Sequence, residues 1–307
     1  MQPADLIFFN CADGHKMPVH KWLPPGPCKA IVFLIHGMAE HGGRYAGFAG
    51  FLNNSGIGLY AADLRGHGMA VPAESLLGVA GPGWVNKQIN DLYDFVNNLK
   101  QAHPNLPVFL FGHSMGSFLA QRYVQLYGNT IRGLVLSGTN GKKDPLLVFG
   151  IGLSRLLMSL RGPSFRSNLI NKLTFGKYNL AFKPARTKFD WLSRDNQEVD
   201  KYVNDPFCGF ISSVEMLYYL FVSLDITFSE AAMVKIPKTL QVYIFAGDKD
   251  AVGMQGKGVK TLIENWEAAG IGNISFKLYR DGRHEMLNDI NKTEVMTDCL
   301  NWMLGRV

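Results

Sequence analysis

The chain has 307 residues, of which 47% are hydrophobic, and its 31 basic and 25 acidic residues give a formal charge of +6. This length and apolar content predict one large folded domain with an insertion and exclude a disordered chain. The basic residues are scattered, so an ordinary solvated surface is favoured over a basic patch that attracts anionic membranes or acidic substrates, and we expect no nucleic-acid partner.

The four cysteines, Cys11, Cys28, Cys208 and Cys299, lie far apart with no C-x-x-C spacing. This spacing argues against a zinc site and against a disulfide scaffold, and no metal ligand set stands out elsewhere. The N-terminus lacks the pattern of a secretory leader, and no apolar run reaches the roughly 18–20 residues needed to span a bilayer. We therefore expect free thiols in a cytoplasmic protein that is at most peripheral at a membrane surface.

Short apolar runs alternate with longer segments of helical character. An N-terminal antiparallel hairpin is expected at 5–9 and 17–23, around Asp13-Gly14. Continuous apolar runs, typical of strands buried on both faces in a parallel sheet, follow at 30–35, 57–62, 108–111, 131–136, 241–246 and 275–279. Helices are expected at about 44–54, 84–102, 115–128, 256–269 and 291–304.

The alternation stops between the strand ending near 136 and the strand beginning near 240. We predict that residues 141–237 form a mainly helical cap inserted into a core made of residues 1–140 and 238–307. Leucines and Phe149 within 146–160 form a broad apolar helical face. That face fits a lid that contacts lipid and fits equally a helix packed on the core, while Gly150 and Gly152 weaken the helix or serve as a hinge.

A nucleophile motif stands between a strand and a helix. The apolar run 108–111 leads into Gly112-His113-Ser114-Met115-Gly116, after which a helical pattern begins. This is G-x-S-x-G in the strand–turn–helix context that a nucleophile elbow requires. Glycines are needed there because side chains at those positions would clash in so sharp a turn. The pattern predicts an α/β-hydrolase with Ser114 as nucleophile.

The base and the acid follow from chain order, which is serine, then acid, then histidine in this class. Of the eight histidines only His284 comes after Ser114, and it follows the last predicted strand. Asp248 directly follows the buried strand 241–246 and is our choice for the acid, with Asp250 as close competitor. Asp281 lies too near His284 in sequence. The acid would orient the imidazole and stabilise the imidazolium that forms during reaction.

Two backbone N–H groups are expected to bind the oxyanion. One belongs to Met115, directly after the nucleophile, and the other to Met38, in the turn after the strand 30–35. His36 could be a ligand, but a residue that buttresses this turn is the favoured interpretation. The loop Arg65-Gly66-His67-Gly68 is likewise interpreted as structural rather than as a phosphate or metal site.

Five blocks along the chain resemble the monoacylglycerol lipase and lysophospholipase-like branch of the α/β-hydrolases, bacterial type. The blocks are HGMAEHGGRY at 36–45, DLRGHG at 63–68, GHSMGS at 112–117, GDKD at 247–250 and RHEMLN at 283–288. The resemblance implies a mostly parallel eight-stranded sheet flanked by helices, with an inserted helical cap over an acyl tunnel. It implies a serine esterase that hydrolyses a lipid-like ester through an acyl-enzyme without a cofactor, using Ser114, Asp248 and His284 with Met38 and Met115.

The resemblance says less about the alcohol portion of the substrate. It places Glu40 and Arg44 near a glycerol-binding end, although an ion pair that fixes the loop explains these two residues as well. Monoacylglycerol lipases carry a further histidine three residues after the base, where this chain has Leu287, so glycerol recognition is not implied. The partners expected are therefore a lipid-like ester and, through the cap, a transient membrane surface.

Other activities remain open on the same scaffold. A carboxylesterase or thioesterase needs no different machinery. An aminopeptidase needs carboxylates in the cap to hold the substrate amine, and Glu198, Asp200, Asp205 and Glu215 could supply them. A non-catalytic binding module usually lacks part of the triad, whereas this chain has all three residue types. Headgroup, chain length and oligomeric state are not determined by the sequence.

Overall fold

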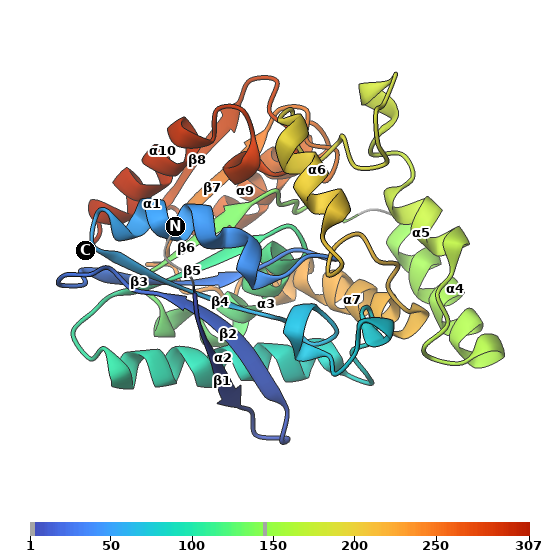
Figure 1. Cartoon of the computed structure of the whole chain (residues 1–307), viewed down its shortest axis with the longest axis horizontal. Helices are drawn as coiled ribbons and strands as arrows, with labels where there is room; N and C mark the ends of the chain where they lie inside the picture. The colour runs from blue at the N-terminus through green and yellow to red at the C-terminus, as the bar shows by residue number, and fades with distance from the viewer. Residues whose placement is uncertain (1–3, 144–145) are drawn as a thin grey trace.

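The computed structural model describes residues 4–143 and 146–307; residues 1–3 of the N-terminus and residues 144 and 145 of the predicted cap lie outside the described residues. At its centre is one sheet of eight strands in the order β1-β2-β4-β3-β5-β6-β7-β8 (Figure 1). The strands are β1 (Asp5–Asn10), β2 (Lys16–Trp22), β3 (Ala30–Ile35), β4 (Ile57–Ala62), β5 (Val108–His113), β6 (Gly133–Ser137), β7 (Gln241–Gly247) and β8 (Ile274–Tyr279).

The sheet is mostly parallel, as predicted. β1 pairs with β2 antiparallel, and β2 pairs with β4 antiparallel, so the predicted hairpin forms one edge of the sheet. All remaining neighbours, from β4 through β8, pair in parallel. Every residue of β3, β4, β5 and β6 is buried, which explains why these strands read as continuous apolar runs rather than as alternating ones.

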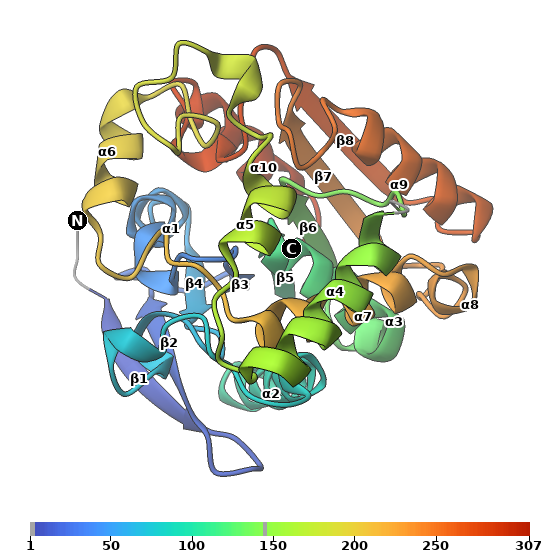
Figure 2. The ribbon, with the colours of Figure 1, turned by 90° about the vertical axis from the view of Figure 1, so that its right-hand side faces the viewer.

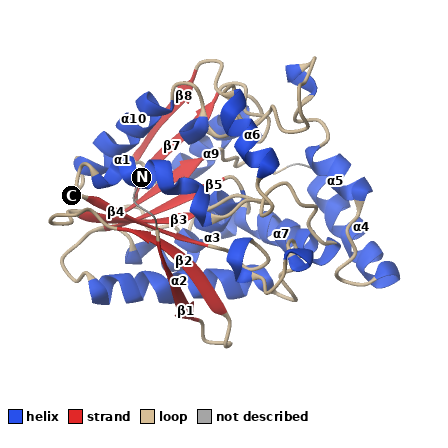
Figure 3. Cartoon of the chain, in the orientation of Figure 1, coloured by secondary structure: helices blue, strands red, loops and turns tan. Residues whose placement is uncertain are grey.

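Helices cover both faces of this sheet (Figure 3). The cluster of buried residues on one face is completed by α1 (Ala46–Asn53) and α10 (Lys292–Leu304). The cluster on the other face is completed by α2 (Trp84–Ala102), α3 (Met115–Tyr127) and α9 (Lys257–Ala268). The predicted helices all form, and the segment expected as one helix from 44 begins as a 3-10 turn, η1 (Gly42–Tyr45), ahead of α1.

The described residues between β6 and β7 contain helices and no strand. These are α4 (Leu146–Arg161), α5 (Asn168–Phe175), α6 (Asn196–Asn204), α7 (Val214–Thr227) and α8 (Glu230–Met233). In Figure 2, α4 and α5 lie in front of the central strands. Further short 3-10 turns are η2 (Gly68–Ala70), η3 (Glu74–Leu76), η4 (Gly128–Thr130), η5 (Leu180–Phe182) and η6 (Met286–Asn288). We infer that this insertion is the cap predicted at 141–237.

Helix α4 packs on the cap core with one face and exposes apolar side chains on the other. It runs unbroken through Gly150 and Gly152, and a Cβ at Gly150 would lie 3.1 Å from the Phe221 ring of α7. The inner face therefore packs closely against the cap core. The outer face keeps large apolar side chains in solvent, among them Leu156 and Leu160 at 54% and 68% exposure. In the described part of the chain, no helix combines the length and the apolar character needed to cross a bilayer.

Candidate active site

Ser114 occupies the sharp turn between β5 and α3. Its backbone is in the left-handed region, with φ 51° and ψ −120°, which non-glycine residues rarely adopt. A Cβ at Gly116 would overlap the Ile35 carbonyl oxygen of β3, and one at Gly112 would lie 2.6 Å from the Gly116 carbonyl oxygen. The two glycines therefore allow the turn, as the motif predicted. The turn leaves Ser114 partly exposed at the start of α3.

His284 follows β8 and is buried, with 1% of its surface exposed. Its Nδ1 donates to Asp250 Oδ1 at 2.9 Å, which leaves the lone pair of the neutral ring on Nε2. Burial acts to lower the pKa of His284, but the charge of Asp250 and this hydrogen bond outweigh it and raise the pKa. Burial and the neighbouring His284 lower the pKa of His113 to about 4, so His113 stays neutral beside the base. Nε2 of His284 forms no hydrogen bond within the described chain.

Asp250, not Asp248, contacts the histidine, so our choice between the two carboxylates was wrong. The Asp248 N–H donates to the Tyr279 carbonyl at 2.9 Å, and its carboxylate accepts the Asp281 N–H at 2.8 Å. Asp248 therefore ties β7 to the loop after β8. The chain then turns, with the Asp250 N–H donating to the Gly247 carbonyl at 3.2 Å. This turn carries the fully buried Asp250 carboxylate to the imidazole.

The turn after β3 is held by side chains around it. The Glu40 carboxylate accepts the Gly37 N–H at 2.5 Å, and His36 Nε2 accepts the Leu64 N–H at 3.1 Å, which confirms His36 as a buttress. The Met38 N–H donates no hydrogen bond to the described chain, and neither does the Met115 N–H at the first position of α3. Both amides are therefore free to bind a ligand oxygen, as expected for an oxyanion site.

A buried ion-pair network lies beside this turn; its Glu40–Arg44 pair agrees with the loop-fixing interpretation, whereas the part played by Glu285 was not predicted. Arg44 donates to Glu40 at 2.7 Å and makes two hydrogen bonds, at 2.8 and 2.7 Å, to Glu285. The Arg44 guanidinium offsets the effect of burial and holds the pKa of Glu285 at about 2. Glu40 belongs to the oxyanion turn and Glu285 adjoins His284, so one guanidinium joins the two loops. Only the adjacency of Glu285 to the base could have drawn attention to it in the sequence.

A cavity of about 560 Å³ opens over these groups, a size within the usual range for small-molecule sites. Its core wall includes Ser114 and His284 together with the turn after β3. Its cap wall is mainly aromatic and aliphatic, with Phe175, Phe189, Trp191, Leu192, Phe210 and Ile211. The Trp191 ring packs on the His284 imidazole with centroids 4.9 Å apart, and the Trp191 carbonyl accepts the His284 N–H at 3.4 Å. The cap thus covers the base directly.

Glu40, Arg44 and Leu287, the three positions that the resemblance connects with glycerol recognition, differ in their surroundings. Glu40 lines the cavity, but both of its carboxylate oxygens already accept hydrogen bonds. Arg44 is engaged with two carboxylates, which favours its interpretation as a loop-fixing residue. Leu287 is 5% exposed and belongs to the apolar cluster under α1 and α10, beside a second, small pocket. It is absent from the lining of the large cavity.

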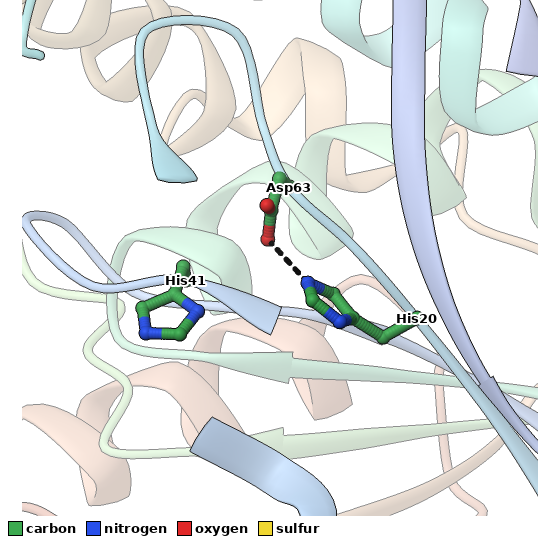
Figure 4. A group of neighbouring side chains, drawn as sticks. All are labelled: His20, His41 and Asp63. Atoms are coloured by element: carbon green, nitrogen blue, oxygen red, sulfur yellow. Dashed lines mark hydrogen bonds and ion pairs between the residues drawn. The ribbon is translucent and has the colours of Figure 1, made fainter. Parts of the chain in front are cut away.

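Two overlapping groups near the hairpin are compact enough to suggest a metal, one of which is drawn in Figure 4: His20, His41 and Asp63. The second combines His41 with Asp205 and Cys208. His41 Nδ1 accepts the Gly43 N–H at 3.2 Å, so its Nε2 carries a proton and donates to Asp205 at 2.9 Å.

The Asp63 carboxylate in the same cluster is equally occupied. It accepts the N–H groups of Gly42 and Met69, both at 2.8 Å, and His20 Nε2 at 3.3 Å. Hydrogen bonding therefore accounts for these side chains, and through Asp205 it links the core to the cap.

The loop after β4 is structural, as predicted. The Arg65 guanidinium pairs with Asp13 of the hairpin and with Asp91 of α2. His67 Nδ1 donates to the Arg65 carbonyl at 3.1 Å, and burial lowers the pKa of His67 to about 3. The Arg65 guanidinium and His67 Nδ1 are thus engaged with the surrounding core, while His67 Nε2 is buried without a partner in the described chain.

Comparison with known proteins covers nearly the whole chain. Residues 26–291 match the model of the family described as serine aminopeptidase, S33. A monoacylglycerol lipase of Mycolicibacterium smegmatis is 25% identical over 306 residues, covering 97% of this chain and 96% of that one. A monoglyceride lipase of Rattus norvegicus is 25% identical over 305 residues, covering 99% and 91%. The solved structure of a thermostable carboxyl esterase from Bacillus coagulans, in complex with glycerol, is 26% identical with a TM-score of 0.91, covering 100% of this chain and 99% of that chain.

Proposed function

The chain belongs to the serine aminopeptidase, S33 family, and we propose that within it this protein is a carboxylic ester hydrolase that acts on lipids. The proposed substrates are monoacylglycerols or lysophospholipids, cleaved through an acyl-enzyme. The relatives named as monoacylglycerol and monoglyceride lipases support the lipid class. The apolar cap wall of the cavity supports it independently, because such a wall suits an acyl chain.

In the proposed mechanism, Ser114 Oγ attacks the ester carbonyl carbon and gives its proton to His284 Nε2. The tetrahedral oxyanion accepts hydrogen bonds from the Met38 and Met115 N–H groups. The imidazolium, stabilised by Asp250, then protonates the alcohol as the carbon–oxygen bond breaks. A water molecule, deprotonated by His284, attacks the acyl-serine and releases the acid, and the proton returns to Ser114.

One observation carries this proposal: the hydrogen bond from His284 Nδ1 to Asp250. It fixes the tautomer in which Nε2 is basic, and that atom is buried without a partner in the described chain, on a residue that shares the cavity wall with Ser114. No hydrogen bond joins Ser114 to His284 among the described contacts. Such catalytic hydrogen bonds commonly tighten only when substrate binds.

The cap carboxylates give no support to an aminopeptidase. Glu198 pairs with Lys201 and Lys292, Asp200 with Arg186, and Asp205 with His41. Glu215 lies in the first turn of α7, and the cap residues that line the cavity include no Asp or Glu. A substrate amine would therefore find no cap carboxylate in the cavity, whereas an ester needs none.

We further propose that the cap touches a lipid surface transiently, in a protein of the cytoplasm. The exposed apolar face of α4 supports the surface contact, since half-exposed leucines gain free energy on entering an interface. The four cysteines are unpaired, which agrees with a reducing compartment.

The proposal is tested by comparing the wild-type protein with Ser114→Ala. Hydrolysis of monoacylglycerol and lysophosphatidylcholine should fall by at least about 10³-fold, and labelling by a fluorophosphonate probe should disappear. Ser164→Ala, an exposed serine in the loop after α4, is the matched control and should behave as wild type. Retention of turnover in folded Ser114→Ala protein would reject the nucleophile. A wild-type protein that cleaves aminoacyl anilides but neither lipid ester would reject the substrate class.

A further inference from the structure

The basic residues form no continuous run, but one part of the cap contains an excess of them over acidic residues. Residues 146–189 contain eight basic residues and no acidic one: Arg155, Arg161, Arg166, Lys172, Lys177, Lys183, Arg186 and Lys188. Their formal charge of +8 exceeds the +6 of the whole chain, so the rest of the chain is net negative. This segment contains α4 and α5 and ends beside the loop that covers the cavity. This excess of positive charge favours an anionic ligand at that end of the cavity.

Two polar residues in this segment line the cavity and have no partner of their own. Lys188, an exposed residue, forms no ion pair within the described chain, and the Asn171 side-chain amide forms no hydrogen bond there. Two other polar lining residues are already occupied: Asn179 donates to the Thr187 carbonyl at 2.7 Å, and the Thr187 hydroxyl donates to Asp190 at 2.5 Å. The cavity thus offers a free cation and a free amide at its cap end.

Lys188 is close in sequence to Trp191, which packs on the catalytic base. Trp191 packs on the imidazole of His284, which is the group that protonates the departing alcohol. Lys188 precedes Trp191 by three residues, a chain distance of at most about 11 Å. The four-carbon side chain of lysine shortens the gap to a ligand further. A negative group on the alcohol, which leaves beside His284, therefore has a cation on the neighbouring stretch of the cavity wall.

Charge near the nucleophile points the same way. Glu40 and Glu285 line the cavity beside Ser114, and with Arg44 between them this trio carries a net charge of −1. An anionic group is repelled there and attracted to the cap end. The acyl chain carries no charge, so the anionic group belongs to the alcohol portion.

We propose that Lys188 and Asn171 form a subsite for the phosphate of an acylated glycerol phosphate, and that this protein prefers such esters to uncharged monoacylglycerols. The inference rests on the proposed ester hydrolysis and names the alcohol portion of its substrate. Lys188 supplies the charge, and the Asn171 amide donates a hydrogen bond to a phosphate oxygen.

The test compares kcat/KM for 1-hexanoylglycerol 3-phosphate and 1-hexanoylglycerol, both used as monomers so that binding to a lipid surface does not contribute. The wild-type protein should favour the phosphate ester by about tenfold, as expected for one charge-assisted contact at a partly solvated site. Lys188→Met should abolish this preference by lowering kcat/KM for the phosphate ester by about tenfold relative to the neutral ester. Lys177→Met removes an exposed charge of the same segment that does not line the cavity, and should change neither value.

A second measurement separates binding from catalysis. Calorimetry with Ser114→Ala protein should detect binding of sn-glycerol 3-phosphate. The double variant Ser114→Ala, Lys188→Met should not bind it. Inorganic phosphate serves as the comparison, and equal affinity for it would show a plain anion site rather than a headgroup subsite. Equal rates for the two esters, or an equal loss for both in Lys188→Met, would overturn the proposal. If neither ester is cleaved, the proposed function fails, and glycerol phosphate binding decides the subsite by itself.

Discussion

Replacing Asp250 with Asn, beside Asp248→Asn, separates the two carboxylates that the sequence left in competition. Asp250 is fully buried and accepts the His284 Nδ1–H at 2.9 Å. An amide there can present its NH₂ group to Nδ1 and so favour the tautomer whose Nε2 carries the proton. That nitrogen could then no longer accept the Ser114 proton, although the shape of the site would be unchanged.

The expected loss is large because the buried charge also stabilises the imidazolium. Loss of the correct tautomer in a serine triad costs about 10⁴-fold in kcat, equivalent to about 5 kcal/mol of transition-state stabilisation. Asp248 is about one-third exposed, and its Oδ1 only accepts the Asp281 N–H, which an asparagine oxygen also accepts. We therefore expect Asp248→Asn to change kcat by less than about threefold, because only a weak exposed ion pair is lost.

Both variants are assayed with a soluble p-nitrophenyl ester, with circular dichroism and thermal melting as controls for folding. A drop in kcat confined to Asp250→Asn supports the arrangement. The reasoning is refuted if folded Asp250→Asn protein keeps near-wild-type turnover, or if Asp248→Asn is the variant that loses it.

Three further predictions concern the catalytic base, the buried ion-pair network and the outer face of α4. The charge of its carboxylate partner raises the pKa of His284, and the neutral ring is the base. We therefore expect kcat/KM to rise with pH through a pKa above 6.5. A pH–rate profile whose acidic inflection lies below pH 6 would contradict this. Arg44→Met leaves two buried carboxylates uncompensated and should lower the free energy of unfolding in urea by about 3–5 kcal/mol. The double variant Arg44→Met, Glu285→Gln should recover part of that loss. An unchanged free energy of unfolding in Arg44→Met alone would show that the network contributes little to stability. Changing Leu156 and Leu160 on the outer face of α4 to Gln should reduce sedimentation with phosphatidylglycerol vesicles at least about tenfold while leaving soluble-ester hydrolysis intact; equal sedimentation would remove α4 from the surface contact.

The sequence predicted every strand and core helix because their signals are local. Runs buried on both faces, such as 30–35 and 57–62, keep their apolar character whatever their neighbours are. The elbow at Ser114 is recognisable because its glycines belong to one five-residue motif. Gly112 avoids a clash within the turn itself, whereas Gly116 avoids one with the Ile35 carbonyl of β3. The base followed from order alone, because only one histidine lies after Ser114.

Only the tertiary structure decided which distant segments contact one another. Asp248 and Asp250 stand two residues apart and look alike in sequence, and the turn after β7 alone determines which carboxylate reaches the imidazole. Arg44 and Glu285 are 241 residues apart, so no local pattern could reveal that they share two hydrogen bonds. The sequence by itself determined which chemical groups are present and which strand ends carry them. The folded chain decided which groups meet, because hydrogen bonds and burial depend on distance in space and not along the polypeptide.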